Sequence, residues 1–200
     1  ELELVGQRAR ERQLPLCIDP MMGDNVHRYQ VFDREYVEAM KDFCQQADVI
    51  IPNLTEASLL TDSSYLEVGS YDEATIEKLL RELSKLGPRK VILTGISFKT
   101  DKIGLAYFDK ETNKTTYLMR KSYKSHFYGS GDLVTAILAS GYFHHLNLLK
   151  VANLALDFMD QVLSSTLASG RPLKYGLCYE PHIGYLFSGF NDLLEENNEK

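Results

Sequence analysis

The sequence predicts an α/β fold, in which a mostly parallel sheet is flanked by helices on both faces. Three short apolar segments, at 14–19, 47–53 and 90–95, alternate with stretches that have helical periodicity. This alternation is typical of strand–helix units that build a parallel sheet. The strand segments are continuously apolar, which indicates burial on both sides. The chain has 200 residues, enough for one domain over 1–200 with a sizeable core.

The first half of the chain divides at clear signals. The expected elements are a helix over 1–13, a strand over 14–19, a loop over 19–25, a helix over 33–46 and a strand over 47–53. Val37, Met40 and Phe43 recur at helical spacing. Asp33 stands where an N-cap would accept a backbone N–H. Pro20 and Gly23 mark the loop.

The second half continues the alternation and ends in long helices. The expected elements are helices over 54–61 and 72–86, a strand over 90–95, a hairpin over 102–120 with a polar turn at 109–114, a helix after Gly131 and a helix over 149–168. Gly87 and Pro88 end the second of these helices. We therefore expect three strands of the parallel part and a hairpin beside them.

Composition excludes several classes of protein. Charged residues make up 25% of the chain, and the net charge is -6 without a basic stripe, which argues against nucleic-acid binding. No apolar run reaches the ~18 residues needed to cross a bilayer. The three cysteines show no paired spacing, so we expect reduced thiols and a cytoplasmic protein that is not bound to a membrane.

Polar residues follow each predicted parallel strand. Because the carboxyl ends of such strands form one rim of the sheet, these residues are expected to lie together: Asp19, Asp24, Asn53, Glu56, Thr94 and Gly95. Carboxylate and amide oxygens are ligands that Mg²⁺ accepts. Each residue alone is typical of a turn or a cap, and the shared placement favours a site.

The stretch "FYGSGDLVTA" places Gly129, Ser130 and Gly131 before Asp132 at a helix start. Free N–H groups at a helix N-terminus bind anions. Asp132 then has two readings: it caps the helix, or it accepts a proton from a substrate hydroxyl while the N–H groups stabilise a transferring phosphoryl group. The stretch lacks the lysine of a Walker A loop.

Five segments in order carry a resemblance to a known family: "DPMMGD", "IIPNLTEASLL", "VILTG", "GSGDLVTAILA" and "KYGLCYEPHIGYL". The chain resembles the ribokinase-like superfamily over nearly its whole length, and most closely its pyridoxal (pyridoxamine) kinase branch. The first four segments point to the superfamily, and the last resembles the C-terminal signature of bacterial pyridoxal kinases.

The resemblance implies an enzyme that uses Mg²⁺ and ATP to phosphorylate the hydroxymethyl group of pyridoxal, pyridoxine or pyridoxamine. It implies that Asp132 is the catalytic base and that Gly129, Ser130 and Gly131 form the anion hole. The implied ATP-binding residues are Asp19, Tyr29, Asn53, Thr94 and Gly95, and the implied metal residues are Asp24 and Glu56. The hairpin over 103–118 would flank the adenine.

Two departures from the family pattern are visible. Many members have Thr where this chain has Ile51. Members also begin with further strand–helix units, so this chain is expected to lack the N-terminal part of the fold. Because removing strands exposes apolar surface, we expect a homodimer or a fragment of a larger protein. Two alternative functions stay open: a hydroxymethylpyrimidine (phosphate) kinase of thiamine synthesis, or a non-catalytic remnant that only binds nucleotide.

Overall fold

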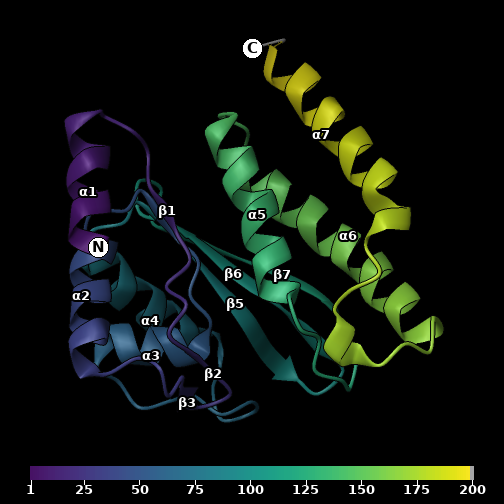
Figure 1. Ribbon diagram of the computed structural model, residues 1–200, viewed down its shortest axis with the longest axis horizontal. Coiled ribbons are helices and arrows are strands. Elements are labelled where there is room, and N and C mark those ends of the chain that lie inside the picture. Colours follow the sequence, from purple (N-terminus) through teal and green to yellow (C-terminus); the bar gives the residue numbers. More distant parts are fainter. Residues whose placement is uncertain (199–200) are drawn as a thin grey trace. The chain divides into compact units, whose positions relative to one another are not determined.

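The computed structural model describes residues 1–198, which form two compact units, Glu1–Met119 and a second one that begins at Arg120 (Figure 1). The first unit contains the sheet with four helices, and the second contains three long helices. Each unit is described in turn.

A five-stranded sheet organises the first unit. Its order is β1 (Cys17–Ile18), β4 (Val49–Ile50), β5 (Lys90–Lys99), β6 (Lys102–Asp109) and β7 (Lys114–Lys121), and β7 runs across the boundary between the units. The pairs β1–β4 and β4–β5 are parallel, and β5–β6 is antiparallel. The predicted α/β fold with a mostly parallel sheet is confirmed, as is the hairpin. The third strand extends beyond the predicted 90–95 because β6 pairs with β5 from Lys90 as far as Lys99.

The four helices of this unit lie where the periodicity placed them. They are α1 (Leu2–Glu11), α2 (Arg34–Cys44), α3 (Leu54–Thr61) and α4 (Glu73–Lys85). Asp33 caps α2 as predicted, because its carboxylate accepts the N–H of Tyr36 at 2.8 Å. Asp72 caps α4 in the same way through Thr75. In Figure 1 these helices lie beside the strands of their own unit.

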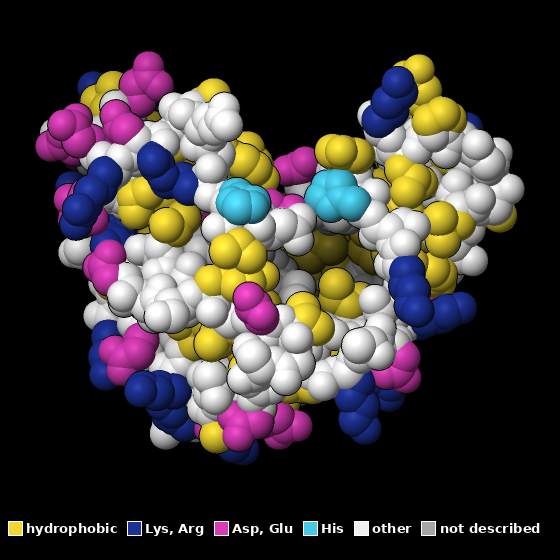
Figure 2. Space-filling view, turned by 90° about the horizontal axis from the view of Figure 1, so that it is seen from below, with side chains coloured by type: hydrophobic (Ala, Val, Ile, Leu, Met, Phe, Trp, Pro, Cys, Tyr) yellow, Lys and Arg dark blue, Asp and Glu magenta, His cyan; other side chains and the backbone are white. Residues whose placement is uncertain are grey.

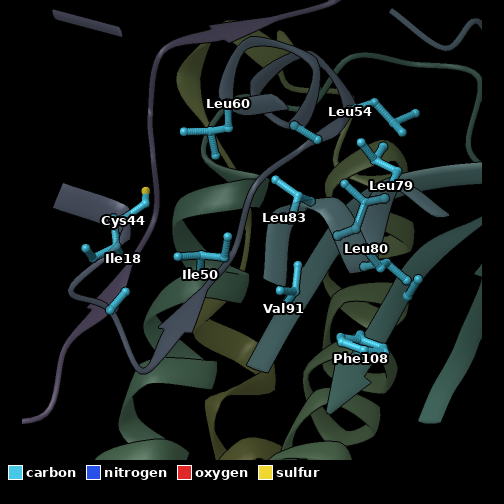
Figure 3. Close-up of a cluster of buried hydrophobic side chains, with 14 of the residues drawn as sticks. Ile18, Cys44, Ile50, Leu54, Leu60, Leu79, Leu80, Leu83, Val91 and Phe108 are labelled. Atoms are coloured by element: carbon cyan, nitrogen blue, oxygen red, sulfur yellow. The ribbon is translucent and has the colours of Figure 1, made fainter. Parts of the chain in front are cut away.

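The core of the first unit is built from apolar faces of these elements. Ile18, Ile50 and Val91 supply the sheet side, and α2, α3 and α4 supply Cys44, Leu60 and Leu83, which Figure 3 shows converging. Val91, Ile92 and Leu93 are consecutive and all fully buried. Successive side chains of a strand point to opposite faces of the sheet, so three consecutive buried residues mean that both faces of β5 are covered. The apolar sequence of this segment predicted that burial.

The segment expected as a loop over 19–25 leads into a small hairpin over 23–28. Strands β2 (Gly23–Asp24) and β3 (His27–Arg28) pair antiparallel, and Asn25 and Val26 form the turn between them. Both turn residues have positive φ, 49° for Asn25 and 72° for Val26. Two-residue hairpin turns with positive φ at both positions strongly prefer Asn-Gly. Here valine takes the glycine position, which explains why the sequence did not reveal the hairpin.

Three helices form the second unit. They are α5 (Ser130–Phe143), α6 (Leu148–Ala168) and α7 (Ile183–Asn198), with short 3-10 turns at Leu173–Tyr175 and Glu180–His182. Helix α5 packs closely on α6 at Gly141, where a Cβ would lie 2.5 Å from Cγ2 of Val151. The helices after Gly131 and over 149–168 are confirmed, whereas α7 was not predicted.

The surface and the cysteines agree with the composition. Figure 2 shows one face on which basic and acidic side chains are interspersed. Within residues 1–198 no helix combines the length and apolar character that crossing a membrane requires.

All three cysteines are free, and Cys17 and Cys44 lie in the first unit. Burial raises the pKa of both of these thiols to about 12, with smaller contributions from nearby carboxylates.

Candidate functional site

The ends of the parallel strands lie in line, as the rim hypothesis required. The N–H of Ile51 donates to the carbonyl of Ile18 at 2.9 Å, and the N–H of Thr94 donates to the carbonyl of Pro52 at 2.9 Å. Asn53 and Thr94 also form an isolated parallel bridge. The polar residues after β1, β4 and β5 therefore meet at one edge of the first unit.

Asn53 and Glu56 cap helix α3 reciprocally. The Asn53 side chain accepts the N–H of Glu56, and the Glu56 side chain accepts the N–H of Asn53, both at 2.9 Å. This is a capping box, which satisfies two backbone donors that a helix start leaves free. Both residues therefore have a structural role in addition to any role toward a ligand.

The same two side chains also hold the segment that follows β1. The Asn53 side-chain amide donates to the carbonyl of Gly23 at 2.9 Å, and Glu56 accepts the N–H of Met22 at 3.1 Å. Between them, the Thr55 hydroxyl accepts the N–H of Val26 at 3.1 Å. We call Asn53, Thr55 and Glu56, with these three bonds, the α3 clamp.

Thr55 is the member of the α3 clamp that sequence reasoning missed. It is only 4% exposed, and its methyl group packs against the backbone at Gly23, where a Cβ would lie 3.1 Å from it. Its signal in the sequence is a hydroxyl residue within the first helical turn, between Asn53 and Glu56. Its partner lies 29 residues earlier, and no local pattern indicates such a pairing.

Glu56 is a buried carboxyl group with a strongly raised pKa. Burial raises its pKa from 4.5 to about 8, and the nearby charge of Asp19 adds to the effect, whereas backbone N–H donors from Asn53, Met22 and Gly23 oppose it. Because a like charge and burial both disfavour the carboxylate, a cation beside Glu56 and Asp19 would favour it. The negative charge of Asp19 therefore acts on the carboxyl group of Glu56.

The remaining rim residues are more open to solvent. Asp24 is half-buried and accepts both the N–H and the side-chain amide of Asn25, at 2.9 Å each. Tyr29 is 41% exposed, and its ring lies 6.4 Å from that of Phe32. Its N–H donates to the carbonyl of Met22 and so closes the hairpin segment. Both residues are carried by the segment that the α3 clamp holds.

Thr94 and Gly95 stand at an irregularity of β5. The pairing with β6 shifts register between Thr94 and Ile96, and Gly95 has φ of 73°. An L side chain would be strained there, although a Cβ would meet nothing within 4 Å. Gly95 is exposed at this irregularity, and its role toward a nucleotide stays a prediction.

The second unit holds the other predicted group at the start of α5. Gly129 is the N-cap with φ of 82°, and no side-chain cap hydrogen bond is formed at this end. Asp132 lies in the first turn and is exposed. The Ser130 hydroxyl donates to the carbonyl of Phe127 at 3.0 Å. Asp132 therefore does not occupy the N-cap position itself, and its role stays a prediction.

The donor set of the first unit suits Mg²⁺ held jointly with a phosphate ligand. Among residues 1–198 no three His, Cys, Asp or Glu side chains gather as a metal cluster. Mg²⁺ is commonly bound through one or two carboxylates, with water and substrate phosphates completing its octahedron. Asp19 and Glu56 fit that pattern, since their mutual repulsion would be relieved by a cation.

The fold, the rim and the glycine-rich start of α5 define a ribokinase-like protein. Residues 1–175 match the phosphomethylpyrimidine kinase family. The chain belongs to that family.

Two curated relatives are hydroxymethylpyrimidine/phosphomethylpyrimidine kinases. The one from Synechococcus elongatus is 24% identical over 171 residues, which cover 85% of this chain and 63% of the relative. The one from Aquifex aeolicus is 23% identical over 160 residues, which cover 78% of this chain and 59% of the relative. The chain therefore spans about three fifths of the length of these proteins.

Solved structures of the same fold include proteins assigned to both substrate classes. One is a Bacteroides thetaiotaomicron protein that is assigned to the phosphomethylpyrimidine kinases and was crystallised with pyridoxal. It is similar to this chain with a TM-score of 0.85 and 25% identity. The similarity covers 92% of this chain and 66% of that protein. Pyridoxal kinase from Lactobacillus plantarum is similar with a TM-score of 0.79, 29% identity, and coverage of 93% and 67%.

Proposed function

We propose that the protein transfers a phosphoryl group from ATP to the hydroxymethyl group of a nitrogen heteroaromatic ring. The observation that carries this proposal is the state of Asp132. It is an exposed carboxylate in the first turn of α5, three residues after the N-cap Gly129. The family match and the similarity to kinases support the same reaction class.

Asp132 is proposed as the base that accepts the proton of the substrate hydroxyl. The oxygen then attacks the γ-phosphorus, the bond from that phosphorus to the β,γ-bridging oxygen breaks, and ADP leaves. The backbone N–H groups at Gly129, Ser130 and Gly131 are proposed to stabilise charge on the transferring group. Their approach is open, because a Cβ at Gly131 would meet nothing within 4 Å.

The rim of the first unit is proposed to bind the nucleotide. Asp19, Tyr29, Asn53, Thr94 and Gly95 would contact ATP, and Asp24 and Glu56 would hold Mg²⁺. The ion neutralises phosphate charge when it is bound. Both Glu56 oxygens accept backbone N–H groups, so Glu56 would act on the ion through water. Asp19 is proposed to share the ion with Glu56 because its charge acts on that residue.

Pyridoxal, pyridoxine and pyridoxamine are the proposed substrates, so the protein would act in vitamin B6 salvage. Similarity to a pyridoxal kinase at 29% identity and to a protein crystallised with pyridoxal supports this choice. Hydroxymethylpyrimidine is the second candidate, and the family match and both curated relatives favour it. Both substrates carry a hydroxymethyl group on a nitrogen ring, so the reaction at Asp132 is the same.

The test is ADP formation from ATP and Mg²⁺ with each alcohol in turn. Asp132→Asn should abolish turnover and leave MgADP binding within about twofold, because it removes the base and keeps the shape. Asp192→Asn is the matched control, since Asp192 is an exposed acid of the second unit. Nucleotide binding by the parent chain without ADP formation from any alcohol would favour the non-catalytic remnant.

We further propose that the protein works as a homodimer in the cytoplasm. An open groove of about 530 Å³ is lined by Leu4, Val5, Leu14 and neighbouring residues, and more than half of each of these three residues is exposed. Strand β1 is the outer strand of the sheet on that side. Sedimentation velocity tests this proposal, and a monomer at all concentrations would contradict it.

A further inference from the structure

The hairpin β2–β3 contains a strained residue that a single side-chain bond restrains. Val26 has φ of 72°, a region that β-branched residues rarely adopt. Its side chain is 53% exposed, so packing does not hold it there. Its backbone N–H, however, donates to the buried hydroxyl of Thr55 at 3.1 Å. Strain of this kind persists only where surrounding contacts over-determine the backbone.

We propose that Thr55 is a positioning residue for the nucleotide site. Its hydroxyl keeps the strained turn closed, and the turn belongs to the segment that carries Asp24 and Tyr29. The other two members of the α3 clamp hold the segment at Met22 and Gly23, before the turn. Thr55 alone among the three reaches the turn itself. This proposal rests on the proposed function, because it gives the hairpin a role toward MgATP.

The close packing at Gly23 strengthens the coupling between Thr55 and the hairpin. A Cβ at Gly23 would lie 2.6 Å from the carbonyl oxygen of His27 and 3.1 Å from the Thr55 methyl group. The two hairpin strands and Thr55 therefore pack closely around this glycine. Loss of the hydroxyl bond releases the turn at its tip, and the methyl contact remains at its base.

Two substitutions at Thr55 separate the hydroxyl from the packing. Thr55→Val keeps the branched shape and removes the acceptor, whereas Thr55→Ser keeps the hydroxyl and removes the methyl group. Thr61→Val is the matched control, because Thr61 is in the same helix and its hydroxyl bonds to Ala57 and Ser63 and not to the hairpin within residues 1–198. Val26→Gly relieves the positive φ and leaves the N–H in place.

The first measurement is hydrogen exchange at the Val26 amide in the whole chain, and the second is MgADP binding by calorimetry. Thr55→Val should speed exchange and weaken MgADP binding by about fivefold or more, as expected for a lost buried hydrogen bond. Thr55→Ser should restore both, and Thr61→Val should change neither. Val26→Gly on the Thr55→Val background should recover part of the affinity, because the released turn is then unstrained.

The outcomes separate this proposal from the proposed function. Faster exchange with unchanged MgADP affinity would overturn the positioning role and leave the kinase proposal standing. Unchanged exchange in Thr55→Val would overturn it as well. If the parent chain binds no MgADP, both proposals fall together. If Thr55→Val does not fold, the single variant Val26→Gly decides the question. Unchanged hydrogen exchange and unchanged MgADP affinity would then mean that the turn is not under strain, and the proposal would fail.

Discussion

The carboxyl group of Glu56 accepts the N–H of Met22 at 3.1 Å, across 34 residues of sequence. One oxygen closes the cap of α3 and the other fixes the segment after β1. A carboxyl group with two backbone donors and 3% exposure is held firmly in place. Burial and the charge of Asp19 raise the pKa of Glu56. The ionisation of this carboxyl group is therefore sensitive to pH and to cations.

The pH dependence of stability should report on Glu56. Its pKa is about 8 in the folded state against an ordinary 4.5, so the folded protein binds this proton more tightly than the unfolded chain. The resulting stabilisation is fully present below pH 4.5 and is lost as the pH rises to about 8, on the order of a few kcal/mol. Melting temperatures measured from pH 5 to 9 should therefore fall.

Glu56→Gln should flatten this profile, because the amide has no charge to bury. The exposed Glu35→Gln serves as the control and should keep the parental slope. An unchanged slope in Glu56→Gln would show that another group governs the transition.

Mg²⁺ should strengthen the effect of ADP on thermal stability. A ligand at 100 times its dissociation constant stabilises by about 2.7 kcal/mol, which raises the melting temperature of a chain of this size by about 5–10 °C. ADP with EDTA should give a smaller shift, since Asp19 and Glu56 then face the phosphates without a cation. Equal shifts with and without Mg²⁺ would argue against the proposed metal residues.

Two glycines at the start of α5 should respond in opposite ways to alanine. Gly129→Ala forces a side chain into φ of 82° and should destabilise by about 1 kcal/mol or more. Gly131→Ala meets open space within the helix and should stabilise by about 0.5–1 kcal/mol. Urea unfolding of both variants measures the difference, and equal effects would contradict the left-handed cap.

The core of the first unit should depend on Leu83. Its side chain is fully buried against the sheet face that includes Ile50 and Val91. Leu83→Ala should lower the free energy of unfolding by about 2–5 kcal/mol. Val31→Ala is the control, because Val31 is 83% exposed and should change stability by less than about 0.5 kcal/mol. Urea denaturation reads out both.

Local signals predicted most elements of the fold. Helix α3 was predicted over 54–61 and is found at Leu54–Thr61, and the N-cap of α2 at Asp33 was predicted from one residue. These features depend on contacts within a few residues. The rim of the first unit was also predicted, since it follows from the geometry of parallel strands.

The features that were missed depend on distant contacts or on unusual residues. The hairpin β2–β3 lacks the glycine that marks such a turn, and the bond from Thr55 to Val26 joins separate elements. The sequence also did not indicate that Asn53 and Glu56 use their side chains to hold a neighbouring segment. The roles assigned to the individual site residues stay predictions.

The half-buried thiol of Cys17 and the buried thiol of Cys44 give the first unit a chemical reporter of its own opening. Thiolates are the reactive form, and Cys17 and Cys44, with pKa values raised to about 12, are almost entirely protonated at neutral pH. Alkylating reagents should therefore modify Cys44 only when the end of α2 is released to solvent, and the half-buried Cys17 should react faster when β1 is released. Mass spectrometry can count the modified thiols over time in the wild-type chain. The counts would follow how each of these two positions becomes exposed.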